Sequence, residues 1–294
     1  MNVHVKNFAA LVEQEWDYPG RGNGTRYTQL HLHAPDMDVT GGKIRISDID
    51  ELANYPDIKS VTISGLQQDT FEYFINTYGK QLRFIEFFKN KFVEDWSLLG
   101  TLPLLEGMTF FHNQRIEKMW DMSGNSALRA VILEDFTRLH DLPGIEKAPA
   151  LEWFDFGDAV WSTSVLNSLQ CLSGSRIRRL CFSGKKIEDM DLSIIPDLKE
   201  LVIFDFPTNL FSTEQVAWLA GNCPGLEGWA IKPYVEVLQY NSETRKSDIP
   251  AVIIVGKRKP SMPIAGNEAR IEMYVKKFEA SVERYRSVPF RDVP

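Results

Sequence analysis

Two short segments of the chain hold the residue types that metal or thiol chemistry needs. His31 and His33 stand two positions apart in HLHAPDMD. On a strand both imidazoles would face one side, together with Asp36 or Asp38, as the ligands of a metal site do. Paired histidines on a strand are more often ordinary surface residues. A metal-dependent site is therefore an alternative interpretation, and the main expectation is that the protein uses no metal and no cofactor.

The second segment is centred on Cys181, which follows Arg179 by two residues. A nearby guanidinium favours the thiolate form of a cysteine. A nucleophilic cysteine also needs a base, and His112 would lie three strands away in the repeating arrangement described below, roughly 14 Å at the usual strand spacing. We therefore predict a non-enzyme without catalytic residues. An enzyme with chemistry at His31 and His33 or at Cys181 is the alternative.

Composition indicates a globular protein of mildly acidic character. The chain has 294 residues, 44% of them hydrophobic, and a net charge of −7, which together allow a large core but do not favour nucleic acid or an anionic membrane. No apolar run is long enough to span a membrane, and Glu13 and Glu15 interrupt the only apolar stretch near the N-terminus. Three cysteines without zinc-site spacing fit a reducing compartment. The predicted location is the cytoplasm, and the oligomeric state is left open.

A short apolar pattern recurs along the chain. LEWFDF (151–156) has the form apolar-x-x-apolar-x-apolar, and the form recurs as IKSVTI (58–63), LRFIEF (82–87), LEGMTF (105–110), LRAVIL (128–133), IRRLCF (177–182), LKELVI (198–203) and LEGWAI (226–231). The starts are separated by 24, 23, 23, 23, 26, 21 and 28 residues, and five prolines each lie two residues before a hexamer. Proline can precede a strand but cannot sit inside a ladder, and parallel strands need a crossover of a dozen residues or more. The period predicts eight short parallel strands with return segments between them.

The pattern resembles the leucine-rich-repeat family, whose motif is L-x-x-L-x-L-x-x-N/C-x-L. The resemblance covers about residues 44–234, and Asn90 and Asn113 match the asparagine of the motif. Other repeats hold other residues at that phase, so a continuous asparagine ladder is not expected. The resemblance implies an α/β fold: a right-handed solenoid with a concave parallel β-sheet, capped at both ends. It also implies a role in binding other proteins.

The chain is expected to divide into three segments. Residues 1–50 are predicted to form an N-terminal cap of a helix and short strands. Residues 51–234 are predicted to form an array of about eight repeats, and residues 235–294 a C-terminal cap with a strand, a basic turn and a helix. Apolar spacing predicts helices over 69–80 and 211–225 between strands, and one along 267–286 as the lid of the last repeat. Residues 240–248 are predicted to be a flexible loop.

Because side chains alternate along a strand, the third and fifth positions of each hexamer and the residue after it are predicted to point to the concave face. In the middle repeats these positions hold aromatic, aliphatic and acidic residues. The same register places Glu200, Val202, Phe204 and Ala230 on this face near the C-terminal end. The predicted partner-binding residues are Phe84, Glu86, Phe88, Phe111, Ile132, Glu134, Trp153 and Asp155.

Aromatic side chains ringed by charge are typical of protein interfaces, whereas monomers rarely leave such a patch in water. The carboxylates favour a basic partner. The sequence therefore predicts a non-enzymatic module that binds a protein or peptide, in a regulatory, effector-like or toxin-neutralising role. Two alternatives to an open binding face remain. A cap, a loop or a second copy covers the patch, or a one-residue slip of register turns these side chains inward.

Overall fold

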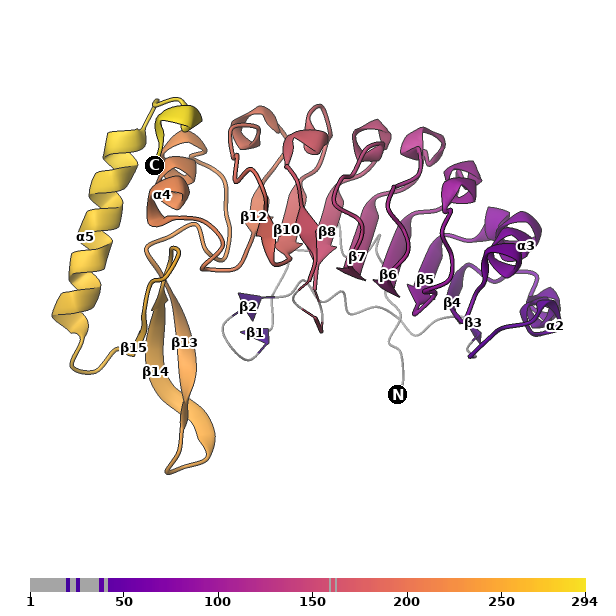
Figure 1. Cartoon of the computed structure of the whole chain (residues 1–294), viewed down its shortest axis with the longest axis horizontal. Coiled ribbons are helices and arrows are strands. Elements are labelled where there is room, and N and C mark those ends of the chain that lie inside the picture. The colour runs from indigo at the N-terminus through magenta and orange to yellow at the C-terminus, as the bar shows by residue number, and fades with distance from the viewer. Residues whose placement is uncertain (1–19, 22–24, 27–36, 40–41, 159, 162) are drawn as a thin grey trace.

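The computed structural model describes residues 20–21, 25–26, 37–39, 42–158, 160–161 and 163–294. Its centre is a parallel sheet of eight strands, each hydrogen-bonded to its neighbour along the chain (Figure 1). The strands are β3 (Met37–Val39), β4 (Ser60–Ser64), β5 (Phe84–Phe88), β6 (Gly107–Asn113), β7 (Ala130–Phe136), β8 (Trp153–Gly157), β10 (Arg179–Ser183) and β12 (Ile203–Asp205). The sheet lines one side of the molecule, and helices and turns line the other (Figure 1). Two-residue strands β1 (Gly20–Arg21) and β2 (Thr25–Arg26) form a separate antiparallel pair.

The return segments are short helices, most of them single turns. Two are full helices: α3 (Gln68–Tyr78), which buries Phe71, Phe74 and Ile75, and α4 (Thr213–Asn222), whose N-cap is Ser212. Both were predicted from apolar spacing. The others are α2 (Ile46–Ile49), η1 (Asp50–Asn54), η2 (Gly79–Gln81), η3 (Ser97–Thr101), η4 (Met122–Gly124), η5 (Ile145–Lys147), η6 (Gln170–Leu172) and η7 (Ile195–Asp197). Strands β9 (Val165–Leu166) and β11 (Lys186–Ile187) pair in parallel on this side.

The core lies between the sheet and the return segments. The first residue of each of the first six hexamers is at most 5% exposed, so each repeat contributes one leucine or isoleucine to a continuous interior row. Aromatic rings link neighbouring repeats: the Phe87 and Phe110 rings stack with centroids 4.9 Å apart, and the Trp96 indole meets both edge-on. Burying such a side chain contributes about 1.5–3 kcal/mol. The row therefore supplies the main force that stacks the repeats.

Buried asparagines satisfy the backbone where the chain leaves the strands. The Asn90 amide donates to the Ile63 carbonyl and accepts from the Leu66 N–H, at 2.8 and 2.9 Å. Asn113 donates to the carbonyls of Asn90 and Val93 and so links to the same ladder. These are the two positions at which the sequence matches the family asparagine. Parallel in-register strands with 23- to 24-residue spacing and this asparagine ladder make the architecture a leucine-rich-repeat solenoid, as the resemblance implied.

The predicted register is wrong in the last two hexamers. Arg179 pairs with Ile203 and not with Glu200, so the seventh strand starts three residues later than expected. The reason is local ambiguity: Leu201, Phe204 and Phe206 satisfy the apolar pattern as well as LKELVI does. Phe204 is consequently a core residue with no exposed surface, while Val202 is 42% exposed before the strand begins.

The eighth hexamer does not form a strand. Only one isolated bridge joins Glu227 to Ile203, after which the chain turns, and Ala230 is buried in the core. The eighth strand of the sheet is β3, at the opposite end of the array, which pairs in parallel with β4. Seven of the eight predicted strands are therefore present, and the eighth described strand of the sheet precedes the predicted array.

The C-terminal end closes the array with a hairpin and a helix. The antiparallel strands are β13 (Tyr234–Asn241), β14 (Lys246–Ile254) and β15 (Ser261–Pro263), followed by α5 (Glu268–Tyr285) and η8 (Phe290–Asp292). Helix α5 packs beside α4, and the Asn222 amide of α4 donates to the Tyr285 carbonyl (Figure 1). The segment 240–248, predicted as a flexible loop, mostly continues β13 and β14 around a short turn. Among the described residues, no helix is both long and apolar enough to cross a membrane.

Candidate protein-binding face

Strand pairing brings the predicted partner-binding residues onto one face of the sheet. We call this the concave face; it is the sheet surface turned away from the core. Three rows cross it. The rows are Ser60–Phe84–Gly107–Ala130–Trp153–Arg179, Thr62–Glu86–Thr109–Ile132–Asp155–Cys181–Asp205 and Ser64–Phe88–Phe111–Glu134–Gly157–Ser183. The central repeats thus have the predicted register. All eight predicted partner-binding residues lie on the concave face.

Half of the set is partly exposed. Phe84, Phe88, Phe111 and Glu134 are half-buried. The Phe88 and Phe111 rings stack across β5 and β6 with centroids 5.2 Å apart and an interplanar angle of 15°. The Lys89 ammonium lies 5.1 Å from the Phe88 ring centroid. These contacts hold an aromatic platform in one orientation, which lowers the entropy that binding would cost.

The other four predicted residues, Trp153, Ile132, Glu86 and Asp155, are buried. Trp153 is 0% and Ile132 1% exposed, yet neither belongs to the interior cluster that fills the solenoid. The Arg179 guanidinium lies 5.3 Å from the Trp153 ring centroid, a cation–π distance. Glu86 and Asp155 are also buried, and the Thr62 hydroxyl donates to the Glu86 carboxylate at 3.3 Å. The indole therefore faces the concave side, and its burial arises on that side.

At the carboxyl ends of three successive strands, β5, β6 and β7, one residue of each repeat lies in the left-handed region. Lys89, His112 and Asp135 have φ of 56°, 62° and 60°. Residues other than glycine adopt this conformation at a cost of about 1–2 kcal/mol. The chain therefore turns in the same way at the end of each of these three strands. It places a lysine, a histidine and an aspartate in successive repeats along one edge of the concave face, and the aspartate is buried there.

An inserted loop sits on this edge, and sequence reasoning did not single it out. The Asp135 carboxylate accepts from the N–H groups of Val160 and Trp161, both at 3.2 Å. The Trp161 ring lies 4.8 Å from the His112 ring, and Val160 and Trp161 are 62% and 45% exposed. One signal was present in the sequence: the 26-residue spacing after LEWFDF exceeds the usual 23, which indicates an insertion in that repeat.

Burial shifts the pKa of two titratable groups near the loop. Burial lowers the pKa of the His112 imidazole, and this outweighs the opposing effect of the Asp135 charge. The His112 Nδ1 atom finds no hydrogen-bond partner within the described part of the chain. Burial likewise raises the pKa of Asp158, although its carboxylate accepts from the Ser164 hydroxyl at 2.6 Å and from the Ser164 N–H. Both groups therefore favour their neutral forms more than they would in water.

The described residues do not bring Cys181 and His112 together. Cys181 is 4% exposed on β10, three strands from the β6 row that leads to His112. Burial raises the pKa of the thiols of Cys171 and Cys223 to about 12 and about 11, so both are poor nucleophiles. His31 and His33 lie outside the described residues. Within the described ranges, no group of three or more His, Cys, Asp or Glu side chains could hold a metal ion.

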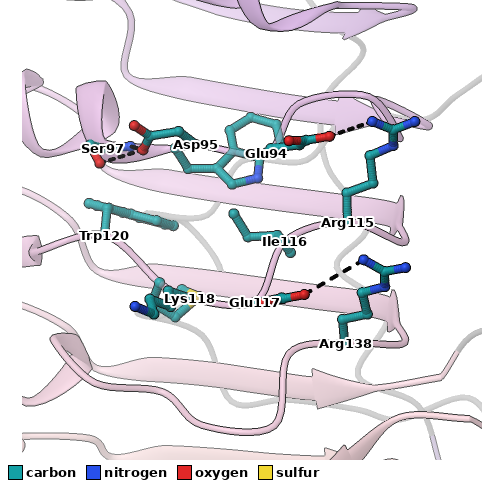
Figure 2. Close-up of a pocket in the computed structure, with 11 residues that line it drawn as sticks. Glu94, Asp95, Ser97, Arg115, Ile116, Glu117, Lys118, Trp120 and Arg138 are labelled. Carbon is teal, nitrogen blue, oxygen red and sulfur yellow. Dashed lines mark hydrogen bonds and ion pairs between the residues drawn. The ribbon is translucent and has the colours of Figure 1, made fainter.

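A polar groove of about 600 Å³ lies on the flank of the solenoid, away from the predicted residues (Figure 2). Two ion pairs cross it at equivalent places in neighbouring repeats, Arg115 with Glu94 and Arg138 with Glu117. Their side chains are between 46% and 66% exposed, so water weakens the pairs. The positive and negative charges that line the groove balance. We therefore interpret it as a solvated ladder of ion pairs that keeps three successive repeats in register.

Comparisons with known proteins add little beyond the fold. No protein-family model matches the chain, and no curated protein matches it. Among solved structures, it is similar to an internalin, InlF, from Listeria monocytogenes, with 19% identity and a TM-score of 0.46. The match covers 68% of this chain and 53% of that one, so the chain spans about half the length of the internalin it matches. The description of the fold therefore rests on the strand register and the asparagine ladder described above.

Proposed function

We propose that this chain is a non-enzymatic module whose concave face binds a protein or peptide of basic character. One observation carries the proposal: Phe84, Phe88 and Phe111 stand partly exposed on the outward face of the sheet, with Phe88 and Phe111 already stacked. Large rings that are partly exposed and rigidly held are what interface anchors require. A protein partner also fits the extended surface that a solenoid offers.

Charge supports the choice of a basic partner. Across the described concave rows and the edge beside them, the acidic residues outnumber the cations Lys89 and Arg179. They are Glu86, Glu134, Asp135, Asp155, Asp158 and Asp205. Glu134 is the half-buried member of this set, so its carboxylate can meet a partner directly. A basic partner would therefore be attracted to this face and would associate faster at low salt.

The accessible half of the predicted set would make the first contact. Phe84, Phe88, Phe111 and Glu134 offer surface directly. Trp153 and Ile132 are buried, so in this proposal they support the exposed residues and do not contact the partner themselves. A location in the cytoplasm is part of the proposal. None of the three cysteines forms a disulfide in the structure, as a reducing compartment would leave them.

The proposal is tested with matched surface variants. Tagged chain is used to capture partners from its native host, and proteins enriched by wild type are compared with those enriched by a Phe88→Ala, Phe111→Ala double variant and by Glu134→Lys. Leu104→Ala serves as the control, because Leu104 is 50% exposed and lies outside the face. Loss of two anchors is expected to weaken the authentic complex at least about tenfold, since each anchor contributes on the order of 1 kcal/mol or more.

The captured partner is then titrated against the four proteins at two salt concentrations. The proposal predicts a basic partner, a weaker complex at high salt, and a further loss for Glu134→Lys at low salt. Unchanged binding by both face variants, or an acidic partner whose affinity ignores salt, would refute it. Circular dichroism of each variant separates lost binding from lost folding.

A further inference from the structure

The hairpin formed by β13 and β14 has an open edge. In the order β13–β14–β15, β13 is the outer strand, and no described strand pairs with its second side. It is eight residues long and reads YVEVLQYN. Proteins usually protect such an edge with lysine, proline, a bulge or a short length. β13 has no lysine and no proline, and the irregularity in its pairing inserts Asp248 in β14.

Exposed apolar side chains accompany this edge. Leu238 is 61% and Tyr240 65% exposed, two residues apart on one face of the strand. Toward the base of the hairpin, the same face is covered: Tyr234 packs against the small cluster under α5 that contains Val252 and Ile271. The tip of the hairpin lies past the lower end of α5 and away from the strands of the parallel sheet (Figure 1). Solvated leucine and tyrosine beside an unpaired strand edge are the features of a pairing surface.

The sequence of β13 is complementary to itself when it runs antiparallel to a copy centred on Leu238. In that register Leu238 faces Leu238 of the second copy, and Glu236 faces Tyr240, whose hydroxyl can donate to a carboxylate. No like charges meet. Shifting the centre to Glu236 would place two carboxylates opposite each other, which is unfavourable. A twofold arrangement of this kind closes on itself after two chains.

We propose that β13 pairs with β13 of a second copy of this chain, forming an antiparallel dimer centred on Leu238. The paired edges supply main-chain hydrogen bonds, and Leu238 and Tyr240 of both copies leave water together. The interface is small, so the dimer is expected to be concentration-dependent. The proposal is independent of the partner proposed for the concave face, because the residues that carry it lie only on the hairpin.

Sedimentation velocity of the full chain over roughly 1–200 μM tests the proposal, a range in which a small interface should change its occupancy. The mass of wild type is expected to rise from the monomer value of 33.7 kDa toward twice that value. Leu238→Lys places two ammonium groups opposite each other and should keep the protein monomeric at every concentration. Leu104→Lys adds the same charge at a leucine that is 50% exposed elsewhere and should dimerise as wild type does.

Cross-linking tests the register. A cysteine at Leu238→Cys would face its own copy, and directly opposed side chains in an antiparallel pair approach closely enough for a disulfide. Mild oxidation should then give a covalent dimer, whereas Leu104→Cys should not. A wild type that stays monomeric at about 200 μM overturns the proposal, and so does a dimer that survives Leu238→Lys or fails to cross-link at position 238. Unchanged circular dichroism shows that each variant is folded.

Discussion

Replacing Asn113 by alanine should cost a large share of the free energy of unfolding. Asn113 is 3% exposed, and its side chain makes four hydrogen bonds. Its amide donates to the carbonyls of Asn90 and Val93 at 2.9 and 3.0 Å, and its oxygen accepts from the N–H groups of Arg115 and Ile116 at 2.8 and 2.9 Å. Alanine removes all four and leaves backbone groups without partners where water has little access.

The magnitude follows from the number of bonds. A net value of about 1 kcal/mol for each bond sets the scale, and buried groups left unsatisfied add to it, so the expected loss is about 3–5 kcal/mol. Whole domains are stable by only about 5–15 kcal/mol. Asn113→Ala should therefore shift the unfolding midpoint strongly toward lower denaturant. It should also speed hydrogen exchange in the two repeats that Asn113 joins.

Urea unfolding followed by circular dichroism measures the effect, with an unchanged slope against urea as the sign that the unfolded state is not altered. Asn113→Asp separates the donor role of the side chain from its acceptor role. The aspartate keeps both acceptor bonds but turns an oxygen toward the carbonyls of Asn90 and Val93. It should lose at least about 2 kcal/mol. Asn54→Ala, which removes one bond from an exposed side chain to Glu51, should change stability by less than about 0.5 kcal/mol. A loss below about 1 kcal/mol for Asn113→Ala would contradict this account of the ladder.

Three further predictions concern His112 and the thiols. Because burial lowers the pKa of His112 in the folded protein, unfolding takes up a proton below the ordinary value of about 6.5. Stability should therefore fall as pH drops from about 7 toward 5, with a shallower slope in His112→Gln; equal slopes would show that another group is responsible. Since His112 has a φ of 62°, His112→Gly should be more stable than His112→Ala by about 1 kcal/mol in urea unfolding, and the reverse order would contradict the left-handed turn. Burial raises the pKa of Cys171 to about 12 and of Cys223 to about 11, so both should react with a disulfide reagent at about pH 8 far more slowly in folded than in urea-unfolded protein; similar rates would show that the thiols are accessible.

Sequence spacing was sufficient to predict the central repeats. From IKSVTI to IRRLCF the hexamers start 23–26 residues apart, so the regular period selects one phase even where a second apolar match overlaps, as ALRAVI (127–132) does. Strand pairing follows that register from Ser60 to Ser183. A period-two alternation then decides which side chains leave the core. This is why the shared face of Phe84, Phe111 and Trp153 could be predicted, and why the prediction was wrong where LKELVIFDF satisfies the pattern in two phases.

Burial on the concave face was decided only by the tertiary structure. Phe111 on β6 and Trp153 on β8 both occupy outward positions of the sheet, yet one is half-buried and the other has no exposed surface. Alternation fixes the side of the sheet to which a side chain points, but its exposure depends on residues far away along the chain. The contact of Trp161 with His112 is of the same kind, because it joins an inserted loop to a turn two repeats earlier. The apolar pattern of a strand thus determines its inner and outer faces, while long-range contacts, which no local spacing encodes, determine how much of the outer face meets water.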